Sequence, residues 1–338
     1  PSESTLKGND AKDGERNTPV VTVVYSPQYD IRFFGFERLH PFDSRKYGRT
    51  WKELRRRIGR RLWQHHVPVD RAVTDDELLL VHSADYLAKI RQPEALAAAL
   101  ELPPLKRAPG WLLRWIIVRP MRWATRGTVL AAKAAMSSGV AVNLSGGYHH
   151  AKPDRGEGFC LFSDIALAVR SLRAEGLLRE GQRVAYIDLD AHQGNGVCYQ
   201  FLNDKDVFIF DMYNSAIYPF NPEARRRIDC DLPLPYECRG VEYLRTLKTS
   251  LPGFLDSLTR SSGVGLGIYN AGTDVFVDDP LGGLALSAAE ILERDLFVIG
   301  QFRSRGIPVV MLPSGGYTKE SYRLIAATVA CLLEDRGT

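Results

Sequence analysis

The sequence is poor in cysteine and has no closely spaced cysteine pair. Its five cysteines among 338 residues are Cys160, Cys198, Cys230, Cys238 and Cys331, and none of them forms a CxxC motif. An odd number without paired spacing argues against a disulfide framework, so we expect reduced thiols in an intracellular protein, cytoplasmic or, in a eukaryote, also nuclear. Structural zinc sites built from thiolates need clustered cysteines. Any metal must therefore be held by histidine and carboxylate groups.

Long apolar runs and a strong net charge are also missing. No stretch approaches the ~18 consecutive apolar residues of a membrane-spanning helix, and residues 1–18 are polar, without the apolar core of a secretory signal. Lysine and arginine number 44 against 40 aspartate and glutamate, and this net charge of +4 is too small to indicate nucleic-acid binding. The composition, 45% apolar and 25% charged, is that of a globular protein. We expect a flexible tail over 1–18 and one domain over 19–338.

Short apolar runs alternate with helix-like segments along that domain. The expected strands, mostly rich in valine and isoleucine, are residues 21–25, 140–144, 183–189, 207–210, 264–269 and 307–312. The expected helices are residues 128–137, 163–175, 241–258, 287–304 and 319–334. Near-continuous apolar strands alternating with helices predict an α/β fold, with a parallel sheet covered by helices on both faces.

Residues 111–123, with the sequence WLLRWIIVRPMRW, are unusually apolar and aromatic but too short to span a bilayer. Burial in the core explains the segment most simply. An apolar lip beside an active site, or a membrane-surface contact made by tryptophan and arginine, is the alternative.

Glycine-rich turns with ionisable residues follow four of the expected strands. These turns are residues 145–150, 188–196, 270–274 and 313–317. In parallel α/β sheets ligands bind beyond the carboxyl ends of the strands. The four turns therefore predict a ligand site at one edge of the sheet.

The second of these turns contains an alternating run of ionisable residues, Asp188, Asp190 and His192. Alternate residues of a strand share a face, so all three side chains point the same way. Three such groups would destabilise an apolar core, but a metal site explains them. A carboxylate and an imidazole from this run would supply two ligands, and Asp274 from another strand end can supply the third. Helix capping is the simpler explanation for any one of these aspartates, yet it does not account for the whole run.

Two further turns carry candidate catalytic groups. The adjacent His149 and His150 suggest general acid–base chemistry, which needs a group that titrates near neutral pH. Tyr317, after two glycines, could donate its phenolic hydrogen to a developing oxyanion. A structural histidine or a core tyrosine is the alternative in each case.

Taken together, the motifs resemble the arginase–deacetylase superfamily, over about residues 23–334. The motifs are GGYHH at 146–150, GEGFC at 156–160, DLDAHQGNG at 188–196 and SGGY at 314–317. More narrowly, LHPFD at 39–43, DMYN at 211–214, IYP at 217–219 and YNAGTD at 269–274 resemble the class IV histone deacetylases. The resemblance implies a single-domain, three-layer α/β/α fold around a mostly parallel eight-stranded sheet.

The resemblance also implies a role for each site residue. Zinc would be bound by Asp190, His192 and Asp274. Asp188 would orient His149, His150 would face Asn195, and Tyr317 would polarise the substrate carbonyl. The expected substrate-binding residues are His40, Gly147, Gly158, Phe159, Tyr218, Gly315 and Gly316. A structural potassium ion would lie near Asp188, Asp190, His192, Asp211 and Met212.

One position departs from the wider deacetylase pattern. Most zinc deacetylases have aspartate where this sequence has Asn195, as class IV enzymes do. An amide cannot stabilise an imidazolium as a carboxylate does, so we expect His150 to be the less basic histidine and the better neutral base.

The function implied is zinc-dependent hydrolysis of an acyl-lysine amide in proteins or peptides, with long fatty-acyl lysine preferred over acetyl-lysine. A small-molecule deacetylase acting on acetylpolyamine-like substrates would have the same metal ligands, so this function remains an alternative. A non-enzymatic reader or scaffold is a further alternative. An arginase-like site with two manganese ions needs a carboxylate two residues after His192, where Gly194 stands, so the sequence excludes it.

Overall fold

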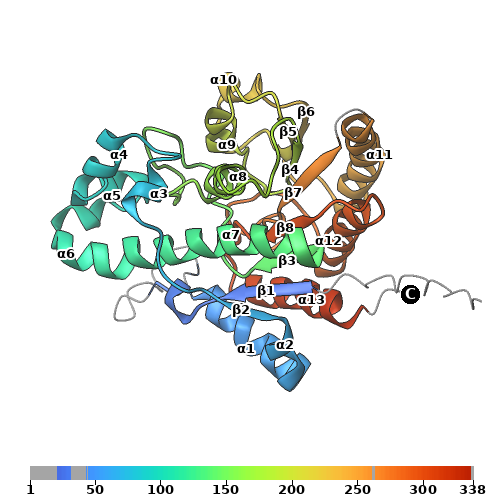
Figure 1. Ribbon diagram of the computed structural model, residues 1–338, viewed down its shortest axis with the longest axis horizontal. Helices are drawn as coiled ribbons and strands as arrows, with labels where there is room; N and C mark the ends of the chain where they lie inside the picture. The colour runs from blue at the N-terminus through green and yellow to red at the C-terminus, as the bar shows by residue number, and fades with distance from the viewer. Residues whose placement is uncertain (1–20, 32–42, 44, 261–262, 336–338) are drawn as a thin grey trace, which may run out of the picture.

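The computed structural model describes residues 21–31, 43, 45–260 and 263–335 (Figure 1). Within these residues lies one sheet of eight strands in the order β2-β1-β3-β8-β7-β4-β5-β6, and its neighbours pair in parallel. The strands are β1 (Val21–Tyr25), β2 (His66–Pro68), β3 (Val140–Asn143), β4 (Arg183–Asp188), β5 (Val207–Asn214), β6 (Cys230–Leu234), β7 (Val264–Asn270) and β8 (Val309–Leu312). His40 and the tail over 1–18 lie outside the described residues.

The sequence predicted six of these strands and missed the two at the edges of the sheet. β2 and β6 are short and partly exposed, and each contains a proline, Pro68 and Pro233. Edge strands tolerate proline because one row of their backbone groups has no ladder partner. Because they are also partly exposed, they lack the continuous apolar pattern of central strands. β5 also continues four residues beyond its predicted end at residue 210, through the buried polar residues Asp211 and Asn214.

Helices cover the sheet in two layers. The helices are α1 (Lys46–Ile58), α2 (Leu62–His65), α3 (Asp75–Leu78), α4 (Ala84–Lys89), α5 (Pro93–Ala99), α6 (Gly110–Leu113), α7 (Arg119–Ser138), α8 (Asp164–Ala174), α9 (Asn195–Gln200), α10 (Pro222–Arg225), α11 (Gly240–Thr259), α12 (Ala288–Arg303) and α13 (Ser321–Glu334). Helix α7 packs on β1, β3 and β8 and beside α8, whereas α1, α13, α12 and α11 contact one another in succession (Figure 1). Parallel crossovers are right-handed, so connections that advance in opposite directions along the sheet place their helices on opposite faces.

Most predicted helix ends lie within two residues of the observed ends, where local capping chemistry sets them. Helix α12 begins after Ser287, whose hydroxyl accepts from the backbone of Glu290 while the Glu290 carboxylate accepts from the backbone of Ser287. Helix α7 begins nine residues earlier than predicted, because α6 and a π-helical turn over Arg114–Val118 lead directly into it.

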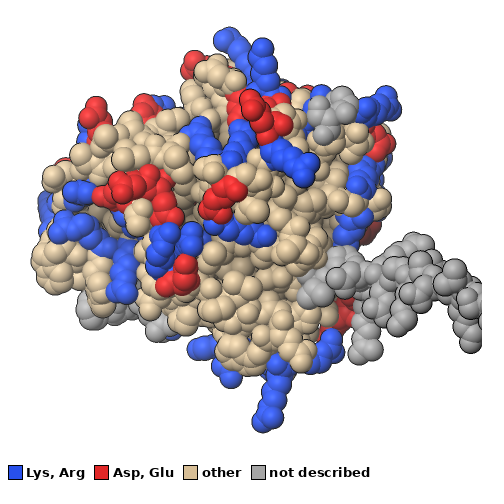
Figure 2. Space-filling view, in the orientation of Figure 1, with Lys and Arg blue, Asp and Glu red and all other residues tan. Residues whose placement is uncertain are grey.

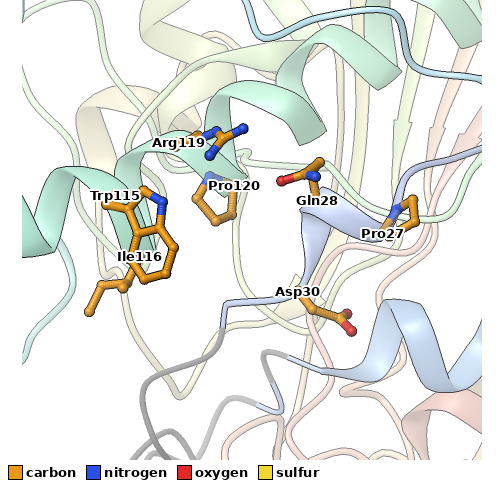
Figure 3. A pocket seen from close by; sticks show the side chains of 7 residues that line it. All are labelled: Pro27, Gln28, Asp30, Trp115, Ile116, Arg119 and Pro120. Atoms are coloured by element: carbon orange, nitrogen blue, oxygen red, sulfur yellow. The ribbon is translucent and has the colours of Figure 1, made fainter.

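Residues 111–123 are therefore helical throughout, and burial in the core describes only part of the segment. Ile116 and Ile117 are 3% and 6% exposed and pack in the core, whereas Trp111 and Trp115 are 65% and 57% exposed. A pocket lies where the segment meets the residues after β1, lined by Pro27, Gln28, Asp30, Trp115, Ile116, Arg119 and Pro120 (Figure 3).

Charges of both signs are interspersed over the face shown in Figure 2. Charged side chains of the described residues form ion pairs, such as Arg71 with Glu77 at 2.6 Å. Among the described residues, every helix is too short or too polar to cross a bilayer.

Candidate active site

Four strands that are distant in sequence place their ends side by side. β3, β8, β7 and β4 are neighbours in the sheet, and the strand register pairs Asp188 with Asn270 and Asn270 with Leu312. Because the strands are parallel, the turns at 145–150, 188–196, 270–274 and 313–317 meet at one edge of the sheet. The predicted site residues on these four turns are thus brought to a common region, as a topological switch point requires.

The side chains of Asp190, His192 and Asp274 form a buried group at this edge. Nδ1 of His192 lies 3.1 Å from Oδ1 of Asp190 and 3.0 Å from Oδ2 of Asp274. One candidate ligand atom from each residue lies within 4.8 Å of the others. Backbone amides fix both carboxylates by hydrogen bonds: the N–H of Gly315 donates to Asp190 at 2.8 Å, and the N–H of Ala191 donates to Asp274 at 2.9 Å.

The electrostatics of this group suit a cation. Burial and the neighbouring carboxylate of Asp190 raise the pKa of Asp274 to about 7, since two carboxylates this close repel each other when both are ionised. A bound divalent ion would offset that repulsion. Two carboxylate oxygens and one imidazole nitrogen are a donor set that zinc accepts in catalytic sites, where a fourth position is left for water or substrate.

His149 is paired with a carboxylate. Its Nδ1 lies 2.9 Å from Oδ2 of Asp188, which also accepts from the hydroxyl of Tyr186 at 2.5 Å, while Asn270 donates to Oδ1 at 3.0 Å. Burial lowers the pKa of His149, but the charges of Asp188 and Asp190 outweigh it and raise the pKa to about 9. His149 is therefore the proton-holding member of the histidine pair.

His150 has an amide partner instead. Its Nδ1 lies 2.7 Å from Oδ1 of Asn195. Burial, together with the positive charges that His149 and His192 can carry, places the pKa of His150 well below its usual value. His150 therefore stays neutral at physiological pH.

Tyr317 lies beside these groups. Its ring centroid is 6.0 Å from that of His192 and 6.1 Å from that of Phe159, and its backbone amide donates to Asp279 at 2.7 Å. Desolvation and the carboxylates of Asp274 and Asp190 raise the pKa of Tyr317 well above its usual value, so its hydroxyl keeps its proton.

Most of the expected substrate-binding residues line one pocket. The lining is Tyr47, Gly146, Gly147, Tyr148, His149, His150, Gly158, Phe159, Cys160, Ser314, Gly315 and Tyr317. Tyr218 stands beside it, with its ring 5.2 Å from that of His150. Gly316 is not part of the lining, and a Cβ there would lie 2.0 Å from Oγ1 of Thr273. None of the described lining residues is shared with the pocket of Figure 3.

Two positions at the pocket require glycine, because neighbouring side chains approach the backbone too closely for a Cβ atom. Gly147 has φ +81, and a Cβ would lie 2.4 Å from Oδ1 of Asn270. Gly158 has φ +54, and a Cβ would lie 2.4 Å from Cδ2 of His150. A side chain at either position would displace a polar group of the site.

Asp211 lies next to Asp188 across the β4–β5 ladder. Oδ2 of Asp211 accepts from the backbone of Gly194 at 2.9 Å, whereas Oδ1 is buried without a hydrogen-bond partner. An unsatisfied buried carboxylate oxygen beside a second carboxylate fits a cation. The role of Met212 in such a site stays a prediction.

Several residues that support the site were not singled out from the sequence. Lys46 is fully buried, its Nζ donates to the backbone oxygen of Ser314 at 2.5 Å, and burial lowers its pKa to about 8. The others are Glu157, Asp164, Tyr186, Asn270 and Asp279. Except for Tyr186, whose partner Asp188 is two residues away, they bond to residues at least 16 positions distant in the chain, so spacing gave no indication of them.

The parallel eight-stranded sheet and the buried Asp190–His192–Asp274 cluster at its edge define an α/β protein with a candidate metal site. Residues 40–333 match the model of the histone deacetylase domain, so the chain belongs to that family of deacetylase-type hydrolases. It is 41% identical over 311 residues to "Histone deacetylase 2" of Arabidopsis thaliana, covering 91% of this chain and 78% of that one. It is 26% identical over 311 residues to "Acetoin utilization protein AcuC" of Staphylococcus xylosus, covering 88% and 78%.

A solved structure shares the fold. The crystal structure of the HDA15 HD domain superposes with a TM-score of 0.71 at 18% identity, covering 94% of this chain and 88% of that one. The three-layer arrangement around an eight-stranded sheet is thereby confirmed.

Proposed function

We propose that this chain is a zinc-dependent hydrolase, of the class IV type within its family, that cleaves the side-chain amide of acylated lysine in proteins or peptides. The observation that carries the proposal is the adjacency of three groups: the His149–His150 pair, the Asp190–His192–Asp274 cluster and Tyr317. Its catalytic domain is residues 19–338, and its free cysteines suit an intracellular compartment, cytoplasmic or nuclear.

Zinc would be held by Asp190, His192 and Asp274, and when bound it supplies Lewis-acid polarisation of the amide carbonyl and of water. The chain's own residues supply the proton transfers. Nε2 of the neutral His150 accepts a proton from the attacking water, and the Tyr317 hydroxyl donates a hydrogen bond to the oxygen that becomes negatively charged. The more basic His149, held by Asp188, provides a proton for the leaving lysine nitrogen.

The remaining predicted residues would bind the substrate or a second cation. Gly147, Gly158, Phe159, Gly315 and Tyr218 border the pocket through which the lysine side chain enters, while His40 and Gly316 retain their predicted roles as substrate-binding positions. A structural potassium ion is proposed at Asp188, Asp211 and Met212, supported by the unpaired Oδ1 of Asp211.

For the acyl group we propose a long fatty chain in preference to acetyl. The class IV motifs support this preference, and the apolar segment 111–123 offers a pocket beside Ile116 (Figure 3). The alternative is a small acetylated molecule, and the similarity to AcuC proteins, whose name refers to acetoin utilization, favours it.

The test is a turnover series on lysine peptides that carry acetyl, octanoyl and myristoyl groups, beside an acetylpolyamine. We expect turnover of the peptides, greatest for myristoyl, loss of turnover with a chelator and recovery with zinc. Turnover of the acetylpolyamine alone would replace the proposal by its alternative. No turnover of any substrate by the zinc-loaded chain would refute both.

A further inference from the structure

Glu157 extends the hydrogen-bond chain behind His150. Asn195 accepts from His150 through Oδ1 at 2.7 Å and donates through Nδ2 to Oε1 of Glu157 at 2.5 Å. Glu157 belongs to the GEGFC motif at 156–160, where no role was predicted for it. Only the side chain of Asn195 lies between the carboxylate of Glu157 and the imidazole of His150, a predicted catalytic residue.

The carboxylate of Glu157 is itself held in place. Nζ of Lys152 lies 2.8 Å from the same Oε1, and the Lys152 side chain is only 4% exposed, with Nζ 4.8 Å above the ring of Tyr199. Nε of Arg155 lies 3.3 Å from Oε2. Burial alone would raise the pKa of Glu157, but the hydrogen bonds from Lys152 and Asn195 outweigh it and keep the pKa below its usual value. Glu157 is therefore an ionised group that only accepts hydrogen bonds.

An amide between these two partners has one favourable orientation. An ionised carboxylate cannot donate, so the amino group of Asn195 must face Glu157 and its oxygen must face His150. Nδ1 of His150 must then carry the hydrogen, and in a neutral imidazole this leaves the lone pair on Nε2. Were the amide free to turn over, its amino group could face Nδ1, and the hydrogen would move to Nε2, where it blocks proton acceptance.

We propose that Glu157 is a positioning residue, which fixes the amide of Asn195 and through it the tautomer of His150. The inference rests on the proposed function only for its catalytic consequence; the tautomer itself is a property of the resting protein. Glu157 and Asn195 are a matched pair on this account, since an aspartate at position 195 would place two carboxylates in hydrogen-bond contact, where they repel unless one is protonated.

The tautomer can be measured without turnover. In the zinc-loaded chain labelled with ¹⁵N-histidine, two-bond ¹⁵N–¹H correlation spectra distinguish an imidazole protonated at Nδ1 from one protonated at Nε2, and His150→Ala assigns the resonances. We expect the Nδ1–H form in the unmodified chain. Glu157→Ala should give a mixture or the Nε2–H form, whereas the control Asp154→Ala, an exposed acid of the same loop, should change nothing. The Nδ1–H form persisting unchanged in Glu157→Ala would overturn the proposal.

A charge-exchange variant tests the pairing with nearly unchanged shape. Asn195→Asp alone sets two carboxylates against each other and should lower kcat by ~10- to 100-fold, the usual effect of losing a group that orients a site residue. Adding Glu157→Gln restores one amide and one carboxylate in exchanged positions. Because a carboxylate at position 195 raises the pKa of His150, most of the kcat and the Nδ1–H form should return at a pH where His150 is neutral. If the fold-losses of kcat in the two single variants simply multiplied in the double variant, the two residues would be independent and the proposed pairing would be contradicted. If the zinc-loaded chain turned over none of the acyl substrates, the proposed function would be refuted. The spectroscopic test of the His150 tautomer would still be valid, because it does not depend on turnover.

Discussion

The imidazole rings of His149 and His150 lie with their centroids 4.0 Å apart, and the pKa values of the two rings are displaced in opposite directions. The charges of Asp188 and Asp190 raise the pKa of His149, whereas burial and the positive charges that His149 and His192 can carry lower the pKa of His150, whose Nδ1 has only the amide of Asn195 as its partner. Two adjacent residues of one type thus acquire different protonation states. Acid–base chemistry on an amide needs one group that holds a proton and one that accepts it.

The first prediction concerns the pH dependence of kcat/KM. His150 has a pKa below 6.5 and loses its accepting lone pair only on protonation, so the activity should fall on the acid side only below about pH 6.5. His149 holds its proton up to about pH 9, so the alkaline fall should lie there. Asp188→Asn removes the charge that raises the pKa of His149, and the alkaline limb should move to lower pH. A pH–rate profile in which that limb does not move would assign it to another group.

The second prediction concerns the metal. Asp190→Ala, His192→Ala and Asp274→Ala should each lose the metal and the activity, because each leaves only two of the three protein ligands. Metal analysis of the purified variants is the measurement, with the exposed Asp76→Ala as the matched control. Full zinc content in Asp274→Ala would remove Asp274 from the ligand set.

The third prediction concerns Tyr317. Tyr317→Phe should keep zinc and fold but lose kcat by roughly two to three orders of magnitude, the usual loss for one oxyanion donor. Tyr236→Phe, at a ring that is 58% exposed, is the control and should leave kcat unchanged. A nearly unchanged kcat in Tyr317→Phe would mean that another group polarises the carbonyl.

The fourth prediction concerns acyl-chain length. Each buried methylene contributes about 0.8 kcal/mol, so ten more could add several kcal/mol even after the cost of ordering the chain. We expect kcat/KM for myristoyl-lysine to exceed that for acetyl-lysine at least roughly a hundredfold, about 2.7 kcal/mol. Equal or greater activity on acetyl-lysine would refute the preference.

A pair of substitutions locates the acyl pocket. Ile116 lines the pocket of Figure 3, whereas Val118 is buried nearby without lining it. Ile116→Asn should lower the myristoyl-to-acetyl ratio of kcat/KM, and Val118→Asn should leave it unchanged. The ratio is insensitive to any loss of folded protein, since both substrates report on the same active fraction. Equal ratios in the two variants would place the acyl chain elsewhere.

The sequence by itself determined the central strands and the candidate ligands. Buried parallel strands must be apolar along their whole length, so β3, β4 and β8 stand out, and the polar residues at their ends stand out against them. The alternation of Asp188, Asp190 and His192 follows from strand geometry alone. The edge strands β2 and β6 lacked this pattern because they are only partly buried.

Only the tertiary structure decided which groups surround those residues. Strands β4 and β7 are separated by 75 residues, from Asp188 to Val264, and their pairing alone brings Asp274 to His192. The same holds for Lys46 beside Ser314, and for Glu157 behind Asn195. A hydrogen bond depends on the positions of two atoms in space, and the spacing of residues along a chain specifies those positions only within one element. The protonation state of each histidine was therefore set by the fold.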